Sequence, residues 1–415
     1  MLIKKVRGFP DHLEEECFQH DSLLSVITSV LNQFSFLKVS PPILEYAEIF
    51  SRTLGKESDI VNKEMYSFQK GEDSFTLRPE GTVGIARMFI TQKLDRELPL
   101  RWFYYGPMFR HERPQKGRFR QFNQLGVEFL GDKEDSADME ILSLAWLLVK
   151  KLKLENKTSL EINTLGSLEE RTNYKKKFKK FLSDFKSQLS LDSQMRLEKN
   201  PLRIWDSKED QDKEILKKAP ILKETLQKDS LNKYEKIKHL LNQFEIPFKE
   251  NHKLVRGLDY YNDLVFEWTS SDLGSQSAFL AGGRYDGLIS QLGGNSTPAI
   301  GWALGLERLS LLCHEFKTKA LKLGLICSLE KQYQEKALKL IYDLRLEGFS
   351  VYHYFSGNFS KQMKRISKKC LFALIYGEKE QNKQEIILKD LKQNKQVSLP
   401  LSSLKQELQK KFNNF

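Results

Sequence analysis

The chain has 415 residues, of which 40% are hydrophobic and 29% are charged, and its net charge is +12. Single cores rarely grow to this length, so we expect two or more domains. No apolar run approaches the roughly 20 residues of a membrane helix, and no basic and then apolar leader opens the chain. Composition therefore favours a cytoplasmic protein without a membrane partner.

The cysteines and the charge distribution further limit the kinds of site and partner that the sequence predicts. The four cysteines show no C-x-x-C spacing or histidine partner, which favours reduced, mostly buried thiols over a zinc site or disulfides. From Lys317 to the C-terminus there are 20 Lys or Arg and nine Asp or Glu, so nearly all of the positive excess lies in the last quarter. This predicts a polyanion that docks there, although a merely solvated lysine-rich surface explains the charge as well.

The N-terminal part predicts a helix, a short strand and then an exposed polar turn. The helix is expected from Asp21, on an apolar stripe of Leu23, Ile27, Val30, Leu31 and Phe34. Further on, the turn TLRPEGT ends at Thr82 between a strand and a helix. It exposes the carboxylate of Glu80 and the hydroxyl of Thr82, which suit a cationic amine. The alternative is an ordinary helix N-cap.

Residues 101–131 predict a β-hairpin with a long cationic tip. They hold six Lys or Arg against two Glu, and the charges concentrate between two apolar or alternating runs. Such a tip is suited to phosphate.

The second strand of this hairpin alternates, so its residues divide between two faces. The even face comprises Arg120, Phe122, Gln124, Gly126 and Glu128, whereas the odd face (Gln121, Asn123, Leu125, Val127, Phe129) resembles core. Gln124 and Glu128 are roughly 13 Å apart between Cα atoms, and Gly126 between them predicts room for a ligand the size of an amino acid. The alternative is an edge hairpin with solvated polar residues or a bulge at the glycine.

The segment 167–249 is predicted to be helical and is rich in lysine, as in NYKKKFKKFLSDF. It shows no paired catalytic groups. A solvated helical spacer accounts for its composition as well as a binding role does.

Three motifs follow. LVRGLDYY (254–261) leads into a strand, AGGRYDG (281–287) is glycine-rich, and PAIGWALGLERL (298–309) predicts a strand that runs into a helix carrying Arg308. Small residues in the last motif leave space for a flat base, and Arg308 is suited to pairing or stacking with a nucleotide. Taken singly, each motif also fits an aromatic core, a tight turn or a surface arginine.

From about Leu321 strands and helices alternate, which predicts an α/β module. It contains no G-x-G-x-x-G or Walker loop, so the sequence does not predict a second nucleotide site there.

Several of these strings resemble one family. FRHE with Arg110, followed by RPQKGR (113–118), resembles motif 2 of the class II aminoacyl-tRNA synthetases, and LVRGLDYY resembles the histidine-specific signature of bacterial-type histidyl-tRNA synthetases. The resemblance runs from Arg7 to the C-terminus in the expected order. The helix, strand and proline before Glu45 resemble motif 1, which implies a homodimer.

The resemblance implies an α+β catalytic domain over 1–320, an antiparallel sheet flanked by helices, with a helical insertion at about 167–249. It implies an α/β anticodon-binding domain over 321–415. The implied reaction joins L-histidine to ATP, giving histidyl adenylate and pyrophosphate, and then transfers histidine to the 3′ end of histidine tRNA. Mg²⁺ would be held mainly by ATP phosphates and not by a protein metal site.

Residue roles also follow from the resemblance, position by position. Arg110 and Arg256 are the expected catalytic residues at the α-phosphate, and ATP is expected to contact Arg110, Arg118 and Arg308. The residues expected to bind histidine are Glu80, Thr82, Gln124, Glu128, Tyr260 and Tyr261. Arg113 and Gln115 are expected to read the 5′ nucleotide of the tRNA acceptor end. Asn123 departs from the family, in which histidine is frequent at this position, but it falls on the odd face.

Two other classes fit the same resemblance. One is a catalytically silent relative, either a regulatory subunit of histidine biosynthesis or a tRNA-sensing domain. The other is a synthetase for another amino acid, such as threonine or proline. The expected substrate residues and the C-terminal module argue against the first, and the string RGLDYY argues against the second.

Overall fold

The structure is a computed structural model of the chain. It describes residues 3–55, 58–255, 258–274, 277–314 and 323–412, apart from the side chains of Asp206 and Phe412. The chain forms two compact units, Met1–Lys317 and Thr318–Phe415. Each unit has its own sheet and its own hydrophobic core.

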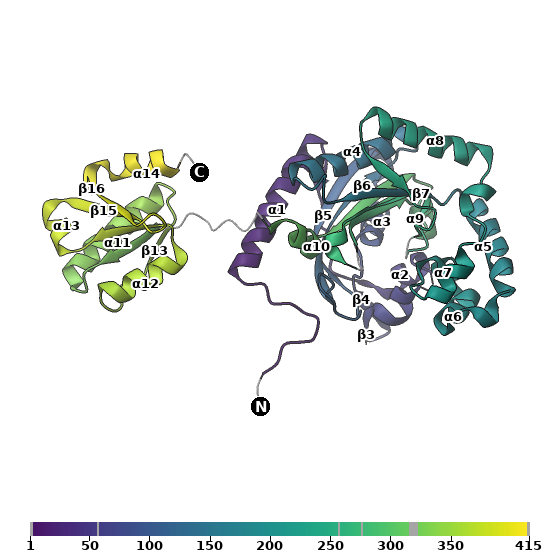
Figure 1. Ribbon diagram of the computed structural model, residues 1–415, viewed down its shortest axis with the longest axis horizontal. Helices are drawn as coiled ribbons and strands as arrows, with labels where there is room; N and C mark the ends of the chain where they lie inside the picture. The colour runs from purple at the N-terminus through teal and green to yellow at the C-terminus, as the bar shows by residue number, and fades with distance from the viewer. Residues whose placement is uncertain (1–2, 56–57, 256–257, 275–276, 315–322, 413–415) are drawn as a thin grey trace. The chain divides into compact units, whose positions relative to one another are not determined.

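An eight-stranded sheet organises the first unit (Figure 1). Its strands run in the order β1 (Leu37–Lys38), β5 (Leu100–Phe109), β6 (Gln121–Leu130), β11 (Ala299–Gly305), β10 (Ala278–Arg284), β9 (Asn262–Thr269), β7 (Ser159–Thr164) and β8 (Phe248–Glu250). The outer pairs β1–β5 and β7–β8 are parallel, and the ladders between them are antiparallel. The sheet is therefore mainly antiparallel, as expected.

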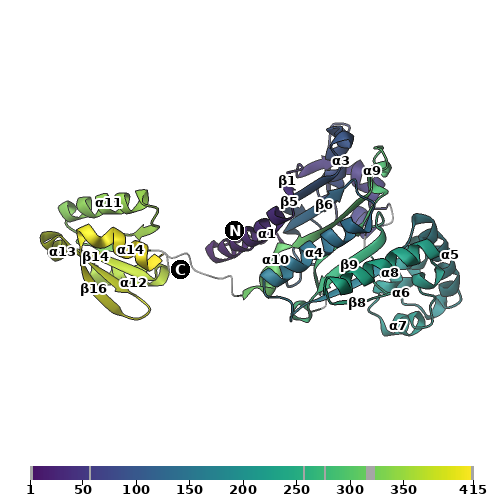
Figure 2. The ribbon, with the colours of Figure 1, turned by 90° about the horizontal axis from the view of Figure 1, so that it is seen from above.

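One face of this sheet is covered by long helices. They are α1 (Glu14–Gln33), α4 (Asp135–Lys151), α8 (Lys228–Gln243) and α10 (Leu306–Leu312). Figure 2 shows α4 lying along the sheet beside α8. Leu125, Val127 and Phe129 of β6 point into this core and are at most 1% exposed, so the odd face is core as predicted. Helix α1 begins seven residues before Asp21, because three glutamates in its first turn favour the N-terminal end of the helix dipole.

The opposite face carries smaller elements. They are α2 (Ala47–Thr53), α3 (Thr82–Thr91), α9 (Leu288–Gln291) and a three-stranded sheet of β2 (Leu44–Tyr46), β4 (Asp73–Leu77) and β3 (Tyr66–Lys70). Short helical turns are η1 (Ile60–Glu64) between α2 and β3, η2 (Leu94–Glu97) between α3 and β5, and η6 (Ser271–Leu273) between β9 and β10.

A group of helices lies between β7 and β8 in sequence. It comprises α5 (Leu168–Ser183), η3 (Lys186–Gln188), α6 (Leu191–Lys199), η4 (Pro201–Asp206), α7 (Asp210–Leu216) and η5 (Leu222–Thr225), and it leads into α8. Figures 1 and 2 show α5, α6 and α7 at the side of the unit away from α1. This group is the expected helical insertion, but residues 248–250 at its end form the strand β8.

The second unit is a five-stranded α/β module. Its sheet runs β13 (Val351–His353), β12 (Leu323–Cys327), β14 (Phe372–Tyr376), β15 (Glu385–Asp390) and β16 (Lys395–Pro400). The first three strands are parallel and the last two are antiparallel. The helical elements are α11 (Lys331–Leu346), α12 (Phe359–Lys369), α13 (Glu378–Lys383), η8 (Leu401–Ser403) and α14 (Leu404–Phe412). In the described part of the chain, no helix has the length and apolar character needed to span a bilayer.

Candidate active site

A cavity of about 550 Å³ opens at the large sheet, next to β6, β10 and β11. The hairpin β5–β6, the turn before α3, the loop before β9, and the strands β10 and β11 all contribute to its lining. It gathers eight of the predicted site residues, namely Glu80, Thr82, Arg110, Arg118, Gln124, Tyr260, Tyr261 and Arg308. Segments more than 200 residues apart in sequence thus meet around one space.

Three guanidinium groups converge in this cavity. Arg110 Nε donates to the carbonyl oxygen of Pro79 at 2.7 Å. Arg308 donates to the carbonyl oxygens of Gly117 at 3.3 Å and Ala278 at 2.7 Å. Burial, and then the positive charges of Arg118 and Arg110, lower the pKa of Arg308 to about 10. The three cations are therefore close enough to repel one another, an arrangement that favours a polyanionic ligand.

Glu112 is the counter-ion of two of these arginines. Its carboxylate is in close contact with Arg118 Nε, and Arg110 Nη1 lies 3.9 Å from the other oxygen. The sequence showed Glu112 merely as one of two acidic residues of the hairpin. Its position directly after the FRH string, among so many arginines, was the available signal that it is their counter-ion.

The turn before α3 presents a buried carboxylate. Glu80 accepts from the main-chain N–H groups of Thr82 at 2.7 Å and Val83 at 2.8 Å. Burial raises the pKa of Glu80, and these hydrogen bonds act in the opposite direction. Glu80 therefore stabilises the helix start, as the alternative held, while it also lines the cavity.

Glu128 is 1% exposed and is not among the described residues that line the cavity, although Thr82, with which it forms a hydrogen bond, is. It accepts hydrogen bonds from Thr82 Oγ1 at 2.7 Å and from the hydroxyl of Tyr285. Burial raises the pKa of Glu128 to about 8. The Tyr285 ring lies 5.7 Å from the ring of Tyr260 and 6.4 Å from that of Tyr261, so Tyr285 joins the predicted acid to the predicted tyrosines.

Gln124 and Glu128 do not form the open slot that the strand pattern predicted. Gln124 lines the cavity, and its Oε1 is buried without a hydrogen-bond partner among the described residues. The room expected over Gly126 is filled by Tyr104, its cross-strand neighbour, because a Cβ on Gly126 would lie 2.1 Å from the ring. Sequence reasoning missed Tyr104 because its register with Gly126 depends on the partner strand.

A similar correction applies to the small residues of β11. Ala303 and Gly305 line the cavity, as expected for a site that admits a flat base. Gly301 instead makes room for Glu128, whose Oε2 would lie 2.2 Å from an added Cβ.

The remaining predicted residues lie elsewhere. Arg113 and Gln115 are exposed at the hairpin tip, where Gln115 forms a two-way main-chain bridge with Arg118. Arg256 falls outside the described residues, whereas Val255 and Leu258 on either side of it line the cavity.

Comparison with known proteins identifies the family of this chain. The family model "Histidyl-tRNA synthetase" matches residues 8–309, and the model "Anticodon binding domain" matches residues 324–411. The Histidine--tRNA ligase of Rhodospirillum rubrum is 41% identical over 408 residues, covering 98% of each chain. That of Prochlorococcus marinus subsp. pastoris is 44% identical over 398 residues, covering 93% of this chain and 91% of the relative.

A solved structure matches as well. Apo histidyl-tRNA synthetase of S. aureus superposes with a TM-score of 0.78 at 29% identity, and the match covers 97% of this chain and 98% of that one. The shared fold, the full-length relatives and the two family models lead to one conclusion. This chain belongs to the histidyl-tRNA synthetase family.

Proposed function

We propose that this chain joins L-histidine to ATP, releases pyrophosphate, and passes the histidyl group to the 3′ end of histidine tRNA. The observation that carries the proposal is the single cavity in which Arg110, Arg118 and Arg308 lie beside Glu80 and the tyrosine pair. Relatives at 40–44% identity that cover nearly the whole chain are histidine–tRNA ligases by name.

In the first step, a carboxylate oxygen of histidine attacks the α-phosphorus and pyrophosphate leaves. Little covalent participation by the protein is needed, so fixed positive charge supplies most of the help. We assign Arg110 and Arg256 to the α-phosphate, and Arg118 and Arg308 to the outer phosphates and the adenine side. Exchange of Glu112 for phosphate oxygens would release the arginines to the substrate.

Mg²⁺ is proposed to be held mainly by the phosphates of ATP. The carboxylates of Glu64 and Glu267 line the same cavity, and hard oxygen donors of this kind suit the ion. The ion would add positive charge at the outer phosphates.

Histidine is proposed to lie against the acidic side of the cavity. Glu80, Thr82 and Gln124 would hold the α-amino group, because an ammonium ion matches a carboxylate and two oxygen acceptors. Glu128, Tyr260 and Tyr261 would recognise the imidazole ring, since hydrogen bonding to ring nitrogens discriminates better than shape alone. The hydrogen bonds of Glu128 to Thr82 and Tyr285 would fix the acid for that purpose.

We assign residues 1–320 to catalysis and 321–415 to anticodon binding, with histidine tRNA as the partner of both. Arg113 and Gln115, at the exposed hairpin tip, would meet the acceptor end. The proposal places the reaction in the cytoplasm, the compartment of translation.

A homodimer is proposed on the basis of an exposed aromatic row on the small sheet. The ring of Tyr46 stacks on Phe75 at 5.2 Å, and Phe75 contacts Phe68 at 6.1 Å. Tyr46 and Phe68 remain 54% and 47% exposed, and an apolar row of this kind favours a protein contact.

ATP–pyrophosphate exchange, measured with each of the twenty amino acids in turn, tests the proposal. Histidine alone should support exchange, and Arg256→Ala should nearly abolish it while the circular dichroism spectrum is unchanged. Exchange with another amino acid, or with none, would refute the assignment.

A further inference from the structure

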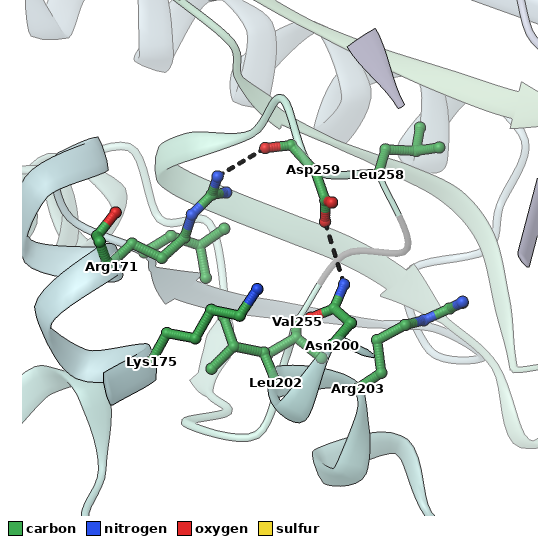
Figure 3. Close-up of a pocket in the computed structure, with 10 residues that line it drawn as sticks. Arg171, Lys175, Asn200, Leu202, Arg203, Val255, Leu258 and Asp259 are labelled. Atoms are coloured by element: carbon green, nitrogen blue, oxygen red, sulfur yellow. Dashed lines mark hydrogen bonds between the residues drawn. The ribbon is translucent and has the colours of Figure 1, made fainter. Parts of the chain in front are cut away.

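The loop that carries Tyr260 and Tyr261 is held by the helical insertion. Arg171, in the first turn of α5, donates from Nη2 to the main-chain oxygen of Asp259 at 2.7 Å and from Nη1 to that of Tyr261 at 2.5 Å. Asn200, at the end of α6, donates to the Asp259 carboxylate at 3.3 Å. Figure 3 shows Arg171 and Asn200 reaching Asp259 from two different elements.

Between these contacts there is a second, smaller cavity of about 160 Å³. Its lining includes Arg171, Lys175, Asn200, Leu202 and Asp259. Because side chains do not fill this space, dispersion contacts contribute little to holding the loop against the insertion there. The hydrogen bonds from Arg171 and Asn200 therefore bridge a local gap in the packing, and they add to the apolar contacts that Val255 and Leu258 make elsewhere in the core.

Arg171 itself is firmly placed. The helix start is closed by a capping box, in which Glu170 N donates to Ser167 Oγ and Ser167 N donates to Glu170 Oε2. Glu170 also accepts from the main chain of Gln227 at 2.6 Å and from Ser230 Oγ at 2.7 Å. Both ends of the insertion thus meet at Glu170, directly before Arg171. Burial lowers the pKa of Arg171, but an arginine keeps its charge at neutral pH.

We infer that Arg171 is a positioning residue for amino acid recognition. It fixes the main chain on both sides of Tyr260, and so holds the Tyr260 and Tyr261 rings against Tyr285. It is not among the residues that line the large cavity, so it acts through the loop and does not touch substrate. The insertion thereby helps to build the amino acid site. This inference rests on the proposed function in taking histidine as the ligand of these tyrosines.

The test compares Arg171→Ala and Arg171→Lys with Lys175→Ala as the matched control. Lys175 lies one turn further along α5 and lines the same small cavity, but contributes none of these hydrogen bonds. In pyrophosphate exchange, Arg171→Ala should raise KM for histidine about tenfold, the effect of losing a charge-assisted hydrogen bond. KM for ATP should stay at the wild-type value. Arg171→Lys can restore one of the two hydrogen bonds, so its KM for histidine should lie between those of the wild type and Arg171→Ala.

Hydrogen–deuterium exchange gives a readout that does not depend on activity. The amides of 258–263 should exchange faster in Arg171→Ala than in the wild type or in Lys175→Ala, while the large sheet keeps its protection. If Arg171→Ala does not fold, KM for histidine and the deuterium exchange of 258–263 are measured on Arg171→Lys and Asn200→Ala instead.

A wild-type KM for histidine with unchanged loop protection in these variants would overturn the inference. So would equal increases in KM for histidine and for ATP, which indicate a general structural role. If the wild type shows no histidine-dependent exchange, the proposed function fails, and the deuterium measurement still decides whether Arg171 holds the loop.

Discussion

Arg110, Arg118 and Arg308 act as a group, since each guanidinium repels the other two, and under the proposed function each would attract the triphosphate of ATP. Burial, and then this repulsion, lower the pKa of Arg308. The single carboxylate of Glu112 offsets part of this repulsion, because it lies next to both Arg110 and Arg118. Glu112 therefore keeps Arg110 and Arg118 close together, an arrangement that would suit the phosphates under the proposed function.

Arg308→Ala should lower kcat/KM for ATP about 100-fold in pyrophosphate exchange, the usual effect of removing one fixed charge from developing negative charge. KM for histidine should change little, because Arg308 lies on the arginine side of the cavity. Arg101→Ala is the control, since Arg101 is on the same hairpin but pairs with Glu140 outside the cavity. Unchanged kinetics with ATP would contradict the assignment of Arg308.

Glu128 predicts a pH effect on stability. Its folded-state pKa is about 8 because of burial, whereas a glutamate in an unfolded chain titrates at about 4.3. Between about pH 5 and 8 the unfolded chain releases a proton that the folded chain keeps, so this group stabilises the fold less as pH rises. The melting temperature of Glu128→Gln should therefore rise relative to that of the wild type as pH increases through this window. Parallel curves for the two proteins would show that the pKa is not raised.

The strand β6 shows which contacts an alternating sequence pattern can predict and which it cannot. The alternation along β6 correctly predicted that Leu125, Val127 and Phe129 enter the core, because alternation is a property of one strand. It wrongly predicted open space at Gly126, because the neighbour that fills it, Tyr104, comes from β5 by register. Arg171 was missed for the same reason: its partners lie 88 and 90 residues away, and nothing in a lysine-rich helix indicates them. Motifs predicted eight of the residues that line the cavity, whereas the contacts among these residues could be known only from the fold.

The hairpin tip predicts a separation between the two half-reactions. Arg113 and Gln115 are exposed and lie outside the cavity lining. Arg113→Ala and Gln115→Ala should thus slow transfer to tRNA about tenfold or more, as expected when base contacts are lost, and leave pyrophosphate exchange unchanged. Lys116→Ala removes a charge from the same exposed tip and should have a smaller effect on transfer. Equal loss in both assays would show that the tip shapes the ATP site instead.

The net positive charge is distributed unequally between the two units. Nearly all of the net positive charge lies from Lys317 onward, and α12 concentrates part of it. Its cations are Lys361, Lys364, Arg365, Lys368 and Lys369. The Arg365 guanidinium lies 3.7 Å from the centre of the Tyr354 ring, so an aromatic surface adjoins the charge, a combination suited to RNA. Composition predicted the polyanion, but a sequence count does not place the charges on one helix.

This division predicts that removing residues 321–415 separates adenylate formation from tRNA charging. The first unit keeps the cavity and both of its cores, so pyrophosphate exchange should remain within about tenfold of the wild type, while charging should fall by about 100-fold or more because phosphate contacts are lost. A full-length variant, Lys364→Ala with Arg365→Ala and Lys368→Ala, controls for damage by truncation. It should raise KM for tRNA most at low salt, because fewer phosphate contacts leave a weaker salt dependence, and it should leave exchange unaltered. Equal losses of exchange and charging in both proteins would mean that the second unit serves the chemistry itself and not the RNA.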